Sequence, residues 1–165
     1  MKNKLTKIFE KVQKIPYQVC QFKEEEINED IKCGDCRHKH FLLKKLLEKE
    51  GFEVKEMKVI FDWKDLPFPK ELLEILQAGT IWDHDSLEVR INKKWIKVDC
   101  TWNLELKQKG FPVTETWDGT SNTEQITKGK LVFHDKEGYT KDSRIKIVKE
   151  EAYEFAEKLN KYLVK

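Results

Sequence analysis

The chain has 165 residues, of which 38% are charged, but 32 basic and 30 acidic side chains leave a formal net charge of only +2. A chain of this length buries roughly two-thirds of its unfolded surface around one core, so we expect one domain over residues 1–165. The balanced charge argues against a nucleic-acid partner, and the lack of any stretch approaching the roughly 18 apolar residues of a membrane span argues against a membrane partner.

The N-terminal third is expected to contain two helices. Apolar residues at helical spacing predict the first over 3–14, ending near Pro16 because proline cannot continue the hydrogen-bond ladder. A polar connection follows over 23–30. The second helix is predicted over 36–50, with Gly51 at the position of a C-terminal cap.

The middle of the chain is expected to be mainly β-structure. Apolar positions over 52–61 predict a strand, and 70–77 predict a short helix after a proline-rich break. Apolar and polar residues alternate over 86–91 and again over 95–100, on either side of the tight segment 92–94. This pattern predicts a β-hairpin.

The remaining segments complete an α+β domain. The polar, glycine-containing stretch 103–129 predicts a long irregular loop, a type of segment that often serves as a binding surface. A strand is expected near 130–134, and an apolar stripe from Val148 to Tyr162 predicts a final helix. We expect an antiparallel sheet packed against the 36–50 helix and covered by the terminal helices.

Cys36 is the strongest candidate for a nucleophile. The chain has four cysteines and no signal-peptide-like apolar run near its start, which favours reduced thiols and a cytoplasmic location. Cys36 falls in the first turn of a predicted helix, where free backbone N–H groups and the helix dipole stabilise a thiolate and lower the pKa of the thiol. Asp35 is the expected N-cap of this helix, and its charge offsets part of that effect.

The hairpin supplies partners for the thiol. With a two-residue turn at 92–93 or 93–94, even-numbered residues of the first strand share a face with odd-numbered residues of the second. With the turn at 92–93, Ser86 lies opposite Asp99, and His84 is a diagonal neighbour about 7–8 Å away. Asp99 can then orient the His84 imidazole while the other ring nitrogen accepts the thiol proton.

Three motifs in this order resemble the transglutaminase-like superfamily of papain-type cysteine enzymes. They are Gly34-Asp35-Cys36 opening a helix, His84-x-x-x-Glu88-Val89, and Trp95-Ile96-Lys97-Val98-Asp99-Cys100-Thr101. Tyr17 matches a tyrosine often found upstream, and the resemblance covers roughly residues 16–102. It implies a transglutaminase-like fold with Cys36 as nucleophile, His84 as general base and Asp99 as the residue that orients it.

The expected chemistry is acyl transfer at a peptide or protein amide. Thiolate attack gives an oxyanion and then a thioacyl-enzyme, which passes its acyl group to water or an amine. We expect a peptidase or amidase first and a transglutaminase second, with no cofactor and no metal. The Cys36 N–H is one expected oxyanion donor, with Gln18 or Gln21 as a second. Trp82 and Trp102 flank the site and are candidate substrate-binding residues.

Three other interpretations stay open at the level of sequence. Cys33-x-x-Cys36 suggests a thiol–disulfide motif, although the preceding 23–32 is charged rather than a buried strand. Zinc binding by Cys33, Cys36, His38 and His40 is a second alternative, with His38 expected to face solvent and His40 the core. A non-catalytic binding domain of the same fold is the third, and the sequence leaves the oligomeric state open.

Overall fold

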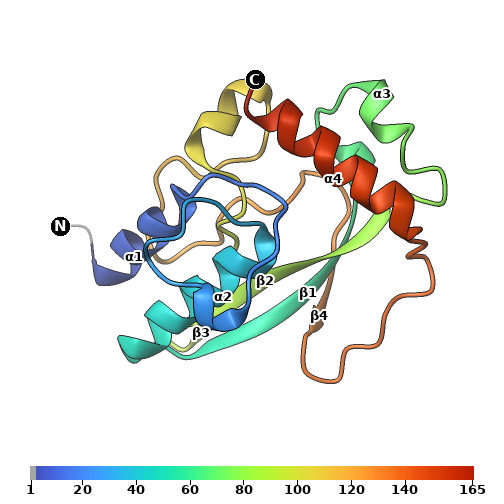
Figure 1. The fold of residues 1–165 in the computed structure, drawn as a ribbon. Coiled ribbons are helices and arrows are strands. Elements are labelled where there is room, and N and C mark those ends of the chain that lie inside the picture. The colour runs from blue at the N-terminus through green and yellow to red at the C-terminus, as the bar shows by residue number, and fades with distance from the viewer. Residues whose placement is uncertain (1–2) are drawn as a thin grey trace.

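The computed structural model describes residues 3–165, which form an α+β fold built on one antiparallel sheet (Figure 1). The four strands are arranged in the order β3-β2-β1-β4. Their bounds are Val54–Asp62 for β1, Ile81–Ile91 for β2, Lys94–Val98 for β3 and Val132–Asp135 for β4. The predicted α+β class with an antiparallel sheet is therefore confirmed.

The β2–β3 hairpin has the register with the turn at 92–93, one of the two that the sequence allows. Asn92 and Lys93 form its turn, and both have positive φ angles, 50° and 67°, as in the type I′ turns that match strand twist. Ile91 pairs with Lys94, and Glu88 pairs with Lys97. Continued by one step beyond Leu87–Val98, this register places Ser86 opposite Asp99, as predicted.

Within residues 3–165, four α-helices pack against the sheet or beside one another. Their bounds are Lys4–Gln13 for α1, Cys36–Lys49 for α2, Lys70–Leu73 for α3 and Lys149–Leu163 for α4. Short 3₁₀ helices span Glu24–Glu26, Trp63–Asp65 and Leu104–Lys109. Helix α2 lies against β2, α1 packs on α2, and α4 lies beside α3 (Figure 1). Helix α3 is shorter than the predicted 70–77, and the other helices agree closely with expectation.

Helix α2 begins and ends where the sequence indicates. The Asp35 carboxylate accepts a hydrogen bond from the Arg37 N–H at 3.0 Å, so Asp35 is the N-cap. Gly51 follows the last turn with φ of 86°, a left-handed conformation that favours glycine at a helix end. These two boundaries fix Cys36 in the first turn of α2.

The segment 103–129 is irregular apart from one 3₁₀ helix, as expected, but several of its side chains belong to the core. It buries five large apolar side chains: Leu106, Phe111, Val113, Trp117 and Ile126. Trp117 packs on Phe9 of α1 with ring centroids 5.0 Å apart. The segment thus contributes packing area rather than the open loop surface that its polar composition suggests. Within residues 3–165, no helix has the length and apolar character needed to cross a bilayer.

Candidate active site

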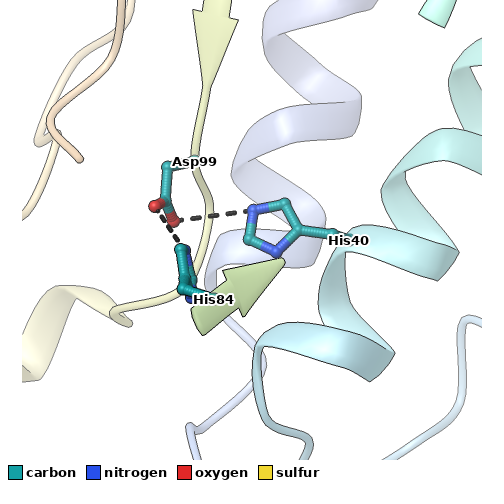
Figure 2. A group of neighbouring side chains, drawn as sticks. All are labelled: His40, His84 and Asp99. Atoms are coloured by element: carbon teal, nitrogen blue, oxygen red, sulfur yellow. Dashed lines mark hydrogen bonds and ion pairs between the residues drawn. The ribbon is translucent and has the colours of Figure 1, made fainter. Parts of the chain in front are cut away.

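His84 and Asp99 form a buried pair at the open end of the hairpin. His84 lies in β2, Asp99 directly follows β3, and His84 Nε2 is 2.8 Å from Asp99 Oδ2. Figure 2 shows the Asp99 carboxylate between the rings of His84 and His40. The predicted orientation of His84 and Asp99 toward one face of the hairpin is confirmed.

Asp99 is held by hydrogen bonds on both carboxylate oxygens. Thr101 donates to Oδ1 through its backbone N–H at 2.9 Å and through its hydroxyl at 2.6 Å. The Asp99 N–H in turn donates to the Thr123 hydroxyl oxygen at 2.8 Å. Burial alone would raise the pKa of Asp99, but the neighbouring His84 and His40 rings outweigh it through charge and hydrogen bonding, and together they hold that pKa well below the usual range. Asp99 is therefore an ionised, immobile acceptor for His84.

His40 links α2 to the strand end that carries Asp99. Its Nδ1 lies 2.8 Å from the Cys36 carbonyl oxygen, and its Nε2 accepts the Cys100 N–H at 3.1 Å. A carbonyl only accepts and an amide N–H only donates, so a neutral ring with its proton on Nδ1 satisfies both contacts. The same Nε2 lies 3.5 Å from Asp99 Oδ1. Sequence reasoning placed His40 in the core, correctly, but gave it no part in this site.

Cys36 lines the same cleft as His84, but its thiol environment differs from expectation. Burial raises the pKa of Cys36 well above its ordinary value, and the nearby carboxylates of Asp85 and Asp35 raise it further. A hydrogen bond from the Asp85 backbone acts in the opposite direction. The prediction of a lowered pKa is therefore wrong, because desolvation and the neighbouring negative charges favour the protonated thiol.

The cleft that contains Cys36 and His84 has a volume of about 320 Å³ and a mainly apolar wall. Trp82 and Trp63 line it from the β-sheet side, and Ala152 and Ala156 line it from α4. Tyr153 at its edge is 62% exposed, so the cleft has an apolar lip that solvent reaches.

Trp102 does not line this cleft, in contrast to the prediction. It is 3% exposed, its ring packs on Tyr17 with centroids 4.7 Å apart, and its indole N–H donates to the Ile126 carbonyl at 2.9 Å. The chain turns after Asp99, which directs the Trp102 ring into the core. Trp82 does line the cleft, as expected for a substrate-binding residue, and so does Gln21, whereas Gln18 is outside its lining.

Comparisons with models of known protein families, with curated proteins and with solved structures gave no match. The resemblance of the three sequence motifs to the transglutaminase-like superfamily therefore stays a prediction. The geometry around Cys36, His84 and Asp99 is the remaining indication of function.

The side chains of His40, His84 and Asp99 are the one group within residues 3–165 that combines metal-ligand donors at suitable spacing, with donor atoms within 4.8 Å of one another. A metal would compete with hydrogen bonds already present there. The His40 lone pair at Nε2 accepts the Cys100 N–H, and the Asp99 oxygens accept from Thr101 and His84. These contacts support a hydrogen-bonded site better than a metal site.

The predicted alternatives that involve the Cys33-x-x-Cys36 segment need revision. His38 is buried rather than solvent-facing, and its Nδ1 accepts the Asp35 N–H at 3.1 Å. The sulfur neighbour of Cys33 is Cys20, with the two Sγ atoms 4.0 Å apart. Neither the proposed zinc set nor a Cys33–Cys36 dithiol corresponds to these contacts.

Proposed function

We propose that this protein is a cysteine-dependent acyl-transfer enzyme that acts on amide bonds, with a transglutaminase-like fold. A peptidase or amidase is the first choice, and transfer to an amine is the second. The observation that carries the proposal is the 2.8 Å contact between His84 and Asp99 beside a cleft that Cys36 also lines. A nucleophile, a base and a residue that orients the base are the groups that acyl transfer requires.

The protonation pattern of His84 suits a general base. Because Nε2 faces a carboxylate that only accepts, the neutral ring carries its proton on Nε2 and leaves the Nδ1 lone pair available. Asp99 cannot rotate away easily, since Thr101 donates to its other oxygen. The pair thus holds the tautomer in which Nδ1 can accept the proton of the Cys36 thiol, and Asp99 stabilises the imidazolium that results.

The raised pKa of Cys36 fits a step in which proton transfer accompanies attack. The thiol gives its proton to His84 Nδ1 as the sulfur bonds to the amide carbonyl carbon, and the carbonyl oxygen becomes an oxyanion. Collapse of this intermediate breaks the carbon–nitrogen bond, and the imidazolium returns the proton to the departing amine. Water or an amine then attacks the thioester, gives a proton to His84 and releases the Cys36 thiol.

Two groups are candidates for stabilising the oxyanion. The Cys36 N–H lies in the first turn of α2, where backbone N–H groups have no intrahelical acceptor. Gln21 lines the cleft beside Cys36, which makes its side chain the better candidate of the two upstream glutamines. The apolar cleft wall of Trp82, Ala152 and Ala156 suits a substrate with an uncharged, apolar group next to the amide.

A trapping experiment tests this proposal. The full chain is incubated with peptide amides that differ in the side chain next to the amide, with and without an added alkylamine, and its intact mass is recorded. We expect an acyl adduct on Cys36 that is absent from Cys36→Ala and present in Cys100→Ala. Release of free acid indicates hydrolysis, and incorporation of the alkylamine indicates transamidation. If no peptide acylates Cys36 but peptides still bind the cleft, the non-catalytic binding domain replaces this proposal.

A further inference from the structure

Cys20 and Cys33 place two thiols in contact outside the acyl-transfer groups. Their Sγ atoms are 4.0 Å apart, and both residues are partly exposed. The backbone brings them together, because the Gln18 N–H donates to the Gly34 carbonyl and the Gly34 N–H donates to the Pro16 carbonyl, each at 3.1 Å. Two hydrogen-bonded segments therefore present one cysteine each at neighbouring positions.

We propose that Cys20 and Cys33 are a site of reversible disulfide formation. A disulfide requires the two sulfurs to approach to about 2 Å, which is a movement of about 2 Å from their present separation and lies within the range of side-chain rotation. In the reduced form the Cys20 thiol donates to the Gln18 carbonyl at 3.3 Å. Within residues 3–165, this weak hydrogen bond is the only one between the Cys20 thiol and the backbone, so rotation toward Cys33 costs little.

The surroundings favour a disulfide over a metal site. His38 Nδ1 lies 3.9 Å from Cys20 Sγ, which would give a third ligand, but it already accepts the Asp35 N–H. Burial and the adjacent Cys33 sulfur raise the pKa of Cys20 to about 12, so the two groups do not both become thiolates near neutral pH. Among the described residues, no third ligand-type donor atom lies within 4.8 Å of both sulfurs, so the pair lacks a metal-ligand set, whereas disulfide exchange needs only the two sulfurs.

The reaction partner is a low-molecular-weight disulfide such as oxidised glutathione. The thiolate of Cys33 attacks one sulfur of this reagent, forms a mixed disulfide and releases one small thiolate. Cys20 then loses its proton and attacks the Cys33 sulfur, forming the protein disulfide and releasing the second small thiolate. The two protein thiols lose two protons and two electrons, and the reagent gains both as two small thiols.

The disulfide would restrain one wall of the cleft. The Cys20 carbonyl accepts a hydrogen bond from Arg37 Nη2 at 3.0 Å, and the next residue, Gln21, lines the cleft. A covalent bond to Cys33 fixes this segment against the chain that precedes α2. The disulfide itself does not require Cys36 to be catalytic, so the two proposals stand independently.

The test uses the intact chain in glutathione buffers of increasing oxidised fraction. We expect loss of two of the four thiols and of two hydrogens, about 2 Da, with full recovery after reduction by dithiothreitol. Trypsin cuts after Lys32 and Arg37, so Cys33 and Cys36 fall in one peptide. The crosslink is therefore mapped in Cys36→Ala, where only Cys33 can account for a bond between the 33–37 peptide and the Cys20 peptide.

The outcomes separate the two proposals. A crosslink that forms equally in wild type and Cys36→Ala supports the Cys20–Cys33 site whatever the result of the acylation experiment. Cys20→Ser should instead stop at a mixed disulfide on Cys33, and Cys100→Ser should behave as wild type. A wild-type chain that retains four free thiols in oxidised buffer, or that joins Cys33 to Cys36, overturns the inference.

Discussion

Lys39 donates a hydrogen bond from its buried ammonium group to the carbonyl oxygen of Thr101 at 2.8 Å. The same Nζ donates to the carbonyls of Gln13 at 3.0 Å and Ile15 at 2.8 Å. One side chain of α2 thus connects the end of α1 to the residue that fixes Asp99. Burial lowers the pKa of Lys39 to about 8, and three acceptors around one nitrogen match the three donors of the charged form.

Replacement of Lys39 by Met should therefore destabilise the fold strongly. The apolar side chain fills a similar volume but leaves three buried carbonyls without this donor, and such losses cost about 1–3 kcal/mol each when unrelieved. We expect a decrease of about 3–5 kcal/mol in the free energy of unfolding, measured by urea denaturation. The exposed Lys45→Met is the matched control on the same helix and should change stability by less than about 0.5 kcal/mol. Equal stabilities would show that the Lys39 contacts contribute little.

Asp99 should make stability depend on pH in the acid range. Its folded-state pKa lies well below the ordinary value of 3.8, so the unfolded chain binds a proton at a higher pH than the folded chain does. The stabilisation by this carboxylate is therefore fully present above the unfolded pKa and is lost as pH falls toward the folded pKa. We expect wild type to lose more stability than Asp99→Asn between about pH 5 and pH 2, measured by urea midpoints at each pH. An equal loss of stability with falling pH in wild type and Asp99→Asn would contradict this prediction.

The pairing of His84 with Asp99 could be predicted because it depends on two local rules. Side chains alternate along a strand, and a two-residue turn fixes which positions face each other. The choice between the two possible turns needed the structure, where Asn92 and Lys93 have positive φ. The bounds of helix α2 could be predicted equally well, because Asp35 and Gly51 mark its two ends.

Features that depend on distant residues could not be predicted in this way. His40 lies four residues after Cys36, so the sequence predicted that the two share one face of the helix. The second partner of His40, the Cys100 N–H, is 60 residues away and could not be predicted. The pKa of Cys36 depends on Asp85, whose distance from α2 is set by how the helix packs on β2. The orientation of Trp102 likewise depends on the Ile126 carbonyl, which belongs to a segment with no regular pattern.

The charge of Asp85 gives a direct test of the Cys36 environment. Because this carboxylate raises the pKa of the thiol, Asp85→Asn should lower that pKa and speed alkylation of Cys36 by iodoacetamide near pH 8. The rate of Cys36 alkylation is measured at a series of pH values by mass spectrometry of the Cys36 peptide. We expect the curve of this rate against pH to shift toward lower pH. Asp135→Asn, an exposed position on the edge strand β4, is the control and should leave the curve in place. An unchanged curve in Asp85→Asn would remove Asp85 as a cause.

His40 should act as a positioning residue for the proposed acyl transfer. Substitution by Phe keeps a ring of similar size but removes both hydrogen bonds, leaving the Cys36 carbonyl and the buried Cys100 N–H without that partner. We expect a loss of about 1–3 kcal/mol in unfolding free energy, because an unpaired buried donor carries its full desolvation penalty.

With a peptide amide that acylates wild type, the rate of acylation at saturation should fall in His40→Phe. The peptide concentration for half-saturation should change little, since His40 does not line the Cys36 cleft. His84→Ala should abolish acylation even in molecules that remain folded, whereas His40→Phe should only slow it, which separates the base from the residue that positions its partners. If His40→Phe is destabilised but acylates at the wild-type rate, the role of His40 is structural only.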